Sequence, residues 1–362
     1  MPTRLEWSEY CNAQIDPHVV ESYRSRCATS LRDQRDNLTK LYRAFKPKQI
    51  ACMGAGFLND IPINLFLRGG SRVALIDWIP RVSEHGFQRD LIRREGKQYT
   101  CLACELGSCP EDVCQKFTRT YSGHGKVCDN FQPVDGSSCQ CASYAPGSVP
   151  RFVKADVTQG CASEFAQRVT PLGQTCKTAS QCFSKAIEIC HECAAMREEL
   201  PLPTGSMDLV TSSMVVSQFE HEPYGYFSKF LAHRYGDELV QQEAQLIPLM
   251  ERLQSDLFEM MLDAHIREMY RLVNKESGAV YFSSELFSSL PQPEHDRYYP
   301  VQLIPQALEK LRNYFTFDSK IIPLEHALRR TKMDTQFSII QSYVLRPLPQ
   351  PLRTGTSVDG IM

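Results

Sequence analysis

Residues 48–78 read KQIACMGAGFLNDIPINLFLRGGSRVALIDW, and this stretch decides the fold. The apolar run 49–53 leads into a glycine turn, residues 54–56, which is followed by a helical segment over 61–67. A second apolar run then ends on Asp77. A strand, a glycine turn, a helix, a second strand and an acid in this order predict one βαβ unit of the nucleotide-binding type.

The glycine turn and Asp77 indicate what this unit would bind. Gly54 and Gly56 can adopt backbone angles that other residues avoid, and they let a ligand approach the main chain. Asp77 stands where a carboxylate can accept hydrogen bonds from two ribose hydroxyls. A dinucleotide fingerprint has a small residue at position 59, but this chain has Asn59. The sequence therefore favours a cofactor without phosphates, and the alternative is an ordinary strand–turn–helix with a surface acid.

This stretch resembles motifs I and II of class I S-adenosylmethionine-dependent methyltransferases, and the likeness extends through most of the chain outside its cysteine-rich middle. In that family the glycine loop cradles the cofactor and the acid after strand two binds its ribose. Family members often carry an acid just before the first glycine, where this chain has Cys52-Met53. The resemblance implies an α/β fold with a Rossmann-like, doubly wound, mostly parallel seven-stranded sheet that closes in an antiparallel hairpin.

Turn and periodicity signals place the other elements. Asp16-Pro17 predicts a helix that runs to about Phe45, and Pro80 predicts one that runs to about Gly96. Further helices are expected at 179–199, 237–274 and 305–314, and strands at 151–155, 207–211, 279–282, 319–322 and 335–345. The last two strands follow each other without a helix between them, which indicates a hairpin at the sheet edge.

Composition divides the chain into a core with two insertions. The expected parts are a helical segment (1–46), the first part of the core (47–96), a cysteine-rich insertion (97–150), a core strand (151–157), a second cysteine-containing insertion (158–206), the rest of the core (207–350) and a flexible tail (351–362). At 362 residues, one α/β domain with insertions is expected rather than three small domains.

The resemblance assigns cofactor-binding roles to residues at the strand ends. They are the glycine loop (Gly54, Ala55, Gly56), the ribose-binding acid (Asp77), the adenine contacts (Trp78, the Asp156 carboxylate and the Val157 amide) and the residues below the methyl donor (Ser212, Ser213). Open α/β sheets bind ligands at the carboxyl ends of their parallel strands, where all of these residues are expected.

The segment after the fourth strand contains SQFEHEPYGYF, where an acceptor group would lie. Methyl transfer is an in-line displacement, so the enzyme mainly positions the nucleophile and removes its proton. His221 is the candidate base because imidazole titrates near neutrality, and Tyr224 is a second catalytic candidate. The alternative places these residues in a solvent-facing loop. The segment lacks the Asn-Pro-Pro-Tyr type of signature of amide- and adenine-methylating relatives, and nothing in it identifies the acceptor. We expect a small-molecule acceptor.

Fifteen cysteines suggest metal or thiol chemistry. Two CxxC pairs and their neighbours predict a zinc site, since zinc prefers four thiolate or imidazole ligands in short-spaced pairs; the candidates are Cys101, Cys104, Cys109, Cys114, Cys190 and Cys193. An iron–sulfur cluster and merely buried cysteines are the alternatives. The two insertions flank the third strand, so we expect one metal-held lobe beside the adenine end of the pocket.

Charge and hydropathy narrow the function further. A net charge of −2 and a pI of about 6.5 provide no field that would attract nucleic acid or an anionic membrane. The opening residues lack the apolar stretch of a signal peptide, and no later run approaches transmembrane length, so a cytoplasmic protein is expected. The rivals to a small-molecule methyltransferase are a thiol or metalloid methyltransferase whose lobe cysteines hold the acceptor, and a non-catalytic metal or redox sensor.

Overall fold

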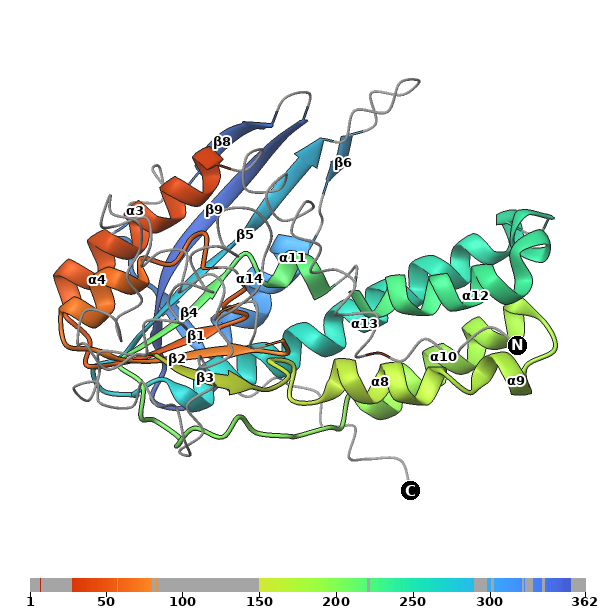
Figure 1. Ribbon diagram of the computed structural model, residues 1–362, viewed down its shortest axis with the longest axis horizontal. Coiled ribbons are helices and arrows are strands. Elements are labelled where there is room, and N and C mark those ends of the chain that lie inside the picture. The colour runs from red at the N-terminus through yellow and green to blue at the C-terminus, as the bar shows by residue number, and fades with distance from the viewer. Residues whose placement is uncertain are drawn as a thin grey trace, which may run out of the picture.

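A computed structural model shows the arrangement of most of these elements (Figure 1). It describes residues 7, 28–56, 58–79, 83, 150–219, 222–241, 243–289, 298–300, 303–320, 322, 328–333 and 336–352. The first part of the helix predicted over 16–45, nearly all of the helix predicted over 80–96, the cysteine-rich insertion up to residue 149 and most of the tail lie outside these residues.

The core is one mixed sheet with the strand order β3-β2-β1-β4-β5-β9-β7. The parallel strands are β1 (Gln49–Met53), β2 (Arg72–Asp77), β3 (Arg151–Lys154), β4 (Leu209–Ser213) and β5 (Ala279–Ser289). Strand β9 (Gln336–Pro347) runs antiparallel to both β5 and β7 (Phe315–Phe317). The predicted seven-stranded path with its antiparallel closure is therefore confirmed.

The sheet differs from the expectation at its closing end. The first closing strand is β7, which lies before the predicted range 319–322. Two further strands, β6 (Tyr298–Pro300) and β8 (Leu328–Met333), extend the sheet by pairing with β5 and β9. Neither β6 nor β8 was predicted. Side chains of β1 and β2 point alternately to the two faces of the sheet. Successive residues therefore belong in turn to hydrophobic clusters on opposite faces, and burial on both faces stabilises these strands.

Helices cover both faces. Helices α3 (Ala28–Phe45) and α4 (Ile63–Arg68) bury Leu41 and Phe66 against one face. The other face is covered by α11 (Val216–Phe219), α14 (Leu303–Arg312) and the inner part of α13 (Glu243–Leu272). The predicted helix over 237–274 is in fact two helices, α12 (Glu222–Gln241) and α13. None of the described helices combines the length and hydropathy that a bilayer crossing requires.

The second insertion is a helical lobe that packs through apolar side chains. Helices α8 (Cys161–Val169), α9 (Leu172–Thr175) and α10 (Ala179–Cys193) pack with α12 and α13 in an arm that extends away from the sheet (Figure 1). Phe227 contacts both Phe165 and Phe183 edge to face in its core. Apolar burial therefore stabilises residues 158–206, the insertion for which the sequence predicts a stabilising metal.

Candidate cofactor site

The glycine turn lies at the carboxyl end of β1 and has the backbone that the sequence predicts. Gly54 and Gly56 have φ values of +62° and +49°, in the left-handed region. A Cβ on Gly54 would lie 2.6 Å from Val215 Cγ2, so the turn has no room for a side chain there. Among the described residues, a Cβ on Gly56 would meet only the Gly54 carbonyl, at 3.8 Å. This part of the structure thus leaves room for a ligand beside Gly56.

Asp77 holds this turn directly. Its Oδ2 accepts a hydrogen bond from the Gly56 amide at 2.9 Å, and its Oδ1 accepts one from the Ile79 amide at 2.9 Å. Burial raises the pKa of Asp77, and these two amides oppose the shift. A carboxylate has about four acceptor positions, so two remain for other donors. The two remaining acceptor positions thus fit the two neighbouring hydroxyls of a ribose.

Trp78 follows Asp77 at the same sheet edge. Its ring is partly buried against the larger hydrophobic cluster, and Lys154 Nζ lies 5.7 Å from the ring centroid. Lys154 ends β3, the strand next to β2, so the indole lies between two strand ends. This position is compatible with a flat aromatic ligand beside Asp77.

Asp156 has a different environment from the one expected for an adenine contact. Its Oδ1 accepts from the Thr158 amide and hydroxyl, and its Oδ2 accepts from the Ser163 amide and hydroxyl. These four bonds occupy the acceptor positions of the carboxylate. Asp156 therefore organises the loop between β3 and α8, in the manner of a helix cap, instead of presenting a free carboxylate.

Ser212 and Ser213, at the end of β4, point to different partners. Ser212 is fully buried, and its Oγ lies 2.8 Å from Nε2 of His265 on α13. Ser213 Oγ lies 3.1 Å from Ser283 Oγ, and the Ser213 hydroxyl also bonds to Asp60. Ser212 is thus a framework residue, whereas Ser213 belongs to a polar cluster beside the glycine turn.

Asp60 is a site residue that sequence reasoning did not assign. Burial raises its pKa, while the Ser213 hydroxyl, its own backbone amide and the Arg35 guanidinium lower it. Arg35 on α3 also donates to the carbonyls of Leu58 and Ile61, at 3.2 and 3.0 Å. A helix that precedes the sheet in the chain therefore anchors the loop after the glycine turn.

Asn59, next to Asp60, has a buried amide oxygen. Its Oδ1 makes no hydrogen bond with any of the described residues. A buried acceptor without a donor is costly, which makes this atom a candidate contact for a ligand. Asn59 and Asp60 together give the far side of the turn the character of a site for a hydrogen-bond donor or a cation.

Backbone strain gathers at the carboxyl edge of the sheet. Three non-glycine residues with left-handed φ follow strand ends there: Leu58 (+54°) after β1, Gln159 (+54°) after β3 and Met214 (+58°) after β4. Such conformations cost about 1–3 kcal/mol each and persist where the surroundings enforce them, frequently at ligand sites. The strain and the predicted ligand edge coincide.

The predicted catalytic residues lie in or beside the start of α12. His221 is outside the described residues. Tyr224 is partly buried; burial raises its pKa, and the Ser228 hydroxyl one turn further on lowers it. A tyrosine with a raised pKa stays protonated at neutral pH. Tyr224 is therefore suited to donate a hydrogen bond and not to act as a base.

The predicted metal ligands are only partly visible. Cys101, Cys104, Cys109 and Cys114 lie outside the described residues. Cys190 and Cys193 are both 1 % exposed within the apolar core of the helical lobe. No cluster of three potential metal-binding side chains occurs among the residues that the structure describes. Within that part of the chain, these two cysteines are packing residues.

The chemistry of the described cysteines agrees with a packing role. Cys161, Cys182 and Cys193 are buried as thiols, and burial raises their pKa to about 12, 12 and 11. A thiol with such a pKa carries little thiolate, the form that binds metals and attacks electrophiles. In this form these three cysteines act as small apolar residues in the packing of the lobe.

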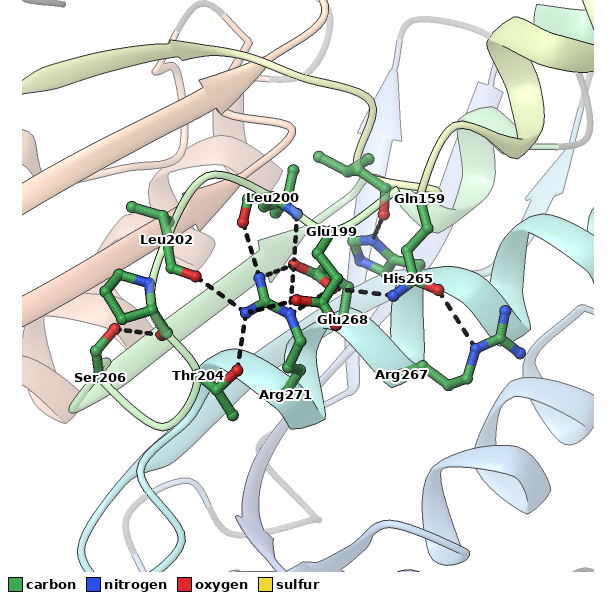
Figure 2. A network of polar contacts seen from close by, with 12 residues as sticks. Gln159, Glu199, Leu200, Leu202, Thr204, Ser206, His265, Arg267, Glu268 and Arg271 are labelled. Carbon is green, nitrogen blue, oxygen red and sulfur yellow. Dashed lines mark hydrogen bonds and ion pairs between the residues drawn. The ribbon is translucent and has the colours of Figure 1, made fainter. Parts of the chain in front are cut away.

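A polar network on α13 ties the lobe to the site (Figure 2). Glu268, which is fully buried, accepts from Gln159 Nε2 at 3.0 Å and from the Leu200 amide at 3.0 Å. Arg271 pairs with the Glu268 carboxylate and donates to the carbonyls of Leu200 and Leu202. The loops on both sides of the inserted helices α8–α10 are thus fixed to one helix.

Comparison with known proteins adds little to this picture. No protein-family model matches the chain, and no curated protein matches it significantly. It is similar to Burkholderia thailandensis 1,6-didemethyltoxoflavin-N1-methyltransferase, solved with bound 1,6-didemethyltoxoflavin and S-adenosylhomocysteine, with 12 % identity, a TM-score of 0.37 and coverage of 96 % of this chain and 92 % of that one. It is also similar to the PH0226 protein from Pyrococcus horikoshii OT3, with 10 % identity, a TM-score of 0.34 and coverage of 90 % and 92 %.

The strand order and direction define the fold. Five parallel strands in the order β3-β2-β1-β4-β5 are continued by β9, which runs antiparallel, and by β7. The glycine turn and Asp77 follow the two central strands β1 and β2, whose last residues pair in register. The chain therefore has a Rossmann-like α/β fold with a mostly parallel sheet that closes in antiparallel strands.

Proposed function

We propose that the chain is an S-adenosylmethionine-dependent methyltransferase that acts on a small-molecule acceptor. The observation that carries this proposal is the hydrogen bond between the glycine turn and Asp77. The Gly56 amide at the end of β1 donates to Asp77, which keeps two acceptor positions for a ribose, and among the described residues only the Gly54 carbonyl would come near a Cβ on Gly56. The closing antiparallel strands favour this family over dinucleotide-dependent dehydrogenases.

In this proposal, described residues would contact the ribose, the adenine and the methionine ammonium of the cofactor. Asp77 would accept from the ribose hydroxyls, and Trp78 with the Val157 amide would contact adenine. Asp60 would face the methionine ammonium, because it is an acid beside the glycine turn whose charge is balanced in part by Arg35. When bound, S-adenosylmethionine supplies a methyl group on a sulfonium. The protein's task is then to orient the acceptor and to exclude water.

The acceptor side is formed by the end of β4 and the start of α12. Of the two predicted serines, Ser213 would lie closer to a ligand, since it bonds to Ser283 in the polar cluster beside the glycine turn, whereas Ser212 bonds to His265 on α13. Tyr224 would hold the acceptor as a hydrogen-bond donor, and His221 would take its proton. The acceptor's proton must leave during or after transfer, so a base on this side matches the reaction.

A pair of glycine substitutions tests the proposal. Gly56→Ala and Gly70→Ala both place a side chain at a positive φ, and neither new Cβ would meet an atom of the described residues closer than 3.8 Å. Both should lose about 1–2 kcal/mol of stability, because the left-handed strain is the same. Gly70 lies in the turn before β2, at the opposite edge of the sheet from the glycine turn.

Calorimetric titration with S-adenosylhomocysteine distinguishes the two variants. The unmodified protein and Gly70→Ala should bind with micromolar dissociation constants, whereas Gly56→Ala should bind at least tenfold more weakly. NAD should not bind. Binding of NAD in place of S-adenosylhomocysteine, or equal affinities for the two variants, would overturn the assignment.

A further inference from the structure

We propose that His265 is a positioning residue. It holds the loop after β3, on the adenine side, and the end of β4 in a fixed relative position. The inference rests on the proposed function, because it takes Val157 as an adenine contact and the β4 end as the methyl-donor side. His265 comes from α13, far along the chain from both partners. It touches neither the reacting atoms nor the cofactor and would act through Val157 and Ser212.

The two hydrogen bonds of His265 fix its protonation. Nδ1 lies 3.1 Å from the Val157 carbonyl oxygen, and Nε2 lies 2.8 Å from Ser212 Oγ. A carbonyl can only accept, so Nδ1 carries the proton and donates it to Val157. In the neutral ring Nε2 is then an acceptor, and the Ser212 hydroxyl must donate to it. Burial lowers the pKa of His265 to about 4, while the Val157 carbonyl and Glu268 raise it, so the ring is neutral at pH 7.

The bond to Val157 locks a complete peptide plane. The Val157 carbonyl is held by His265, and the amide of the same peptide, that of Thr158, donates to Asp156 Oδ1 at 2.8 Å. Rotation of this plane would break both bonds. The Val157 amide, the predicted adenine contact, is adjacent to the locked plane and so has little freedom of its own.

The bond to Ser212 turns its hydroxyl away from the acceptor side. Ser212 is fully buried, and its proton is committed to Nε2 of His265. Phe219 on α11 contacts the imidazole edge to face, with ring centroids 5.2 Å apart, and so limits rotation of the ring. Met214, two residues after Ser212, has a φ of +58°. His265 thus supports the strained end of β4.

A second residue on the same face of α13 secures the same loop. Glu268, one turn after His265, accepts from the Gln159 side chain, and Arg271 neutralises it (Figure 2). The loop after β3 is therefore fixed at residues 157 and 159 by one helix. A histidine that only filled the core would not need two polar partners, both of them in the candidate site.

Two substitutions separate the two bonds of His265. In His265→Asn the side-chain amide can reach the position of Nδ1 and donate to Val157, but no acceptor reaches Ser212. In His265→Gln the side-chain oxygen can reach the position of Nε2 and accept from Ser212, but Val157 loses its donor. Each variant therefore serves as the control for the other.

The measurement is the affinity for S-adenosylhomocysteine and for its inosine analogue, which differs only in the base. His265→Asn should keep the affinity for S-adenosylhomocysteine within about threefold and keep the preference for adenine. His265→Gln should lose about tenfold in affinity and most of that preference, since one lost hydrogen bond is worth about a factor of ten. A purely structural role would weaken both variants alike, and that result would overturn the inference.

Nitrogen NMR of the imidazole in the unmodified protein gives an independent result, with or without cofactor. The neutral ring should carry its proton on Nδ1 at pH 7. A proton on Nε2, or a ring that exchanges between tautomers, would overturn the inference even if S-adenosylhomocysteine binds. Failure of the unmodified protein to bind S-adenosylhomocysteine would instead overturn the proposed function, and with it the assigned role of Val157, while leaving the tautomer result intact.

Discussion

The amide of Gly56 donates a hydrogen bond to Asp77 Oδ2 at 2.9 Å, so the turn after β1 and the acid after β2 are directly joined. In the sequence these are two separate motifs. In the fold the acid shapes the turn before any ligand arrives. Asp77 is consequently part of the architecture as well as a candidate ribose contact, and its substitution should affect both.

We expect Asp77→Asn to weaken S-adenosylhomocysteine binding at least tenfold and to cost about 1–3 kcal/mol of stability. The loss of stability arises because a buried amide is left without its acceptor. Asp208→Asn is the matched control, since Asp208 Oδ2 accepts from the amides of Lys48 and Gln49 at the opposite edge of the sheet. It should lose stability and retain affinity. Calorimetry and urea unfolding measure the two quantities, and unchanged affinity in a folded Asp77→Asn would refute the ribose assignment.

The protein should become less stable as the pH is lowered from about 6.5 to about 4, because of the titration of His265. The folded pKa of about 4 lies below the ordinary value of 6.5, so in this interval the unfolded chain binds a proton that the folded chain does not. The contribution is fully present above pH 6.5 and is lost as the pH falls, up to about 3 kcal/mol. Urea unfolding at several pH values checks this.

His265→Asn is the reference for that experiment, because Asp60 and Asp77 also have raised pKa values. The difference between the two proteins isolates the histidine. It should shrink as the pH falls from 6.5 to 4. A difference that is constant across this range would contradict a buried neutral imidazole.

Glu268→Ala should destabilise the protein by about 3–5 kcal/mol, because it leaves the mostly buried Arg271 without its main partner. Glu199→Ala provides the control. Glu199 also pairs with Arg271, at 3.6 Å, but its side chain is 61 % exposed, so its removal should cost no more than about 1 kcal/mol. Urea unfolding at pH 7 compares them, and equal losses would show that the buried network is not the main tie.

The six described cysteines should resist alkylation in the folded protein. They are Cys52, Cys161, Cys176, Cys182, Cys190 and Cys193, all buried. Burial keeps the reactive thiolate scarce and the sulfur out of reach. Mass spectrometry after brief iodoacetamide treatment should find these positions unlabelled until denaturant is added. Labelling of Cys190 or Cys193 under native conditions would contradict the packing of the lobe.

Metal analysis separates these cysteines from those outside the described residues. Replacing Cys190 and Cys193 together by Ala should leave the bound zinc and iron unchanged. Replacing Cys101 and Cys104 by Ser is the companion experiment for the predicted zinc pair. Loss of one metal equivalent in the Cys190/Cys193 variant would restore the site that spans both insertions.

Local patterns explain why the sheet could be predicted. The run 49–53, the glycine turn and Asp77 are close in sequence, and their order determines the topology of the first unit. On the sequence alone, the cysteines of the lobe are interpreted as metal ligands. In the structure, those of the second insertion share an apolar helical spacing with their neighbours. Cys161, Phe165 and Val169 occupy one buried face of α8, where cysteine acts as a small apolar residue.

The missed site residues depend on contacts between distant parts of the chain. His265 meets Val157 across 108 positions and Ser212 across 53, and no local pattern marks such pairs. The three-residue spacing of His265, Glu268 and Arg271, which places polar side chains on one face of the helix, is the available signal. Asp156 was assigned by its place at a strand end, and its saturation by Thr158 and Ser163 appears only in three dimensions.

The exposed end of the sheet has a further consequence, for solubility. Among the described strands, β3 ends the sheet on one side, and an unpaired edge can recruit a strand from another molecule. This edge is only four residues long, and its exposed terminal residues are Arg151 and Lys154. Two like charges on so short an edge repel the same edge of a second copy. The strand that leads the chain into the candidate site therefore also protects the protein against aggregation.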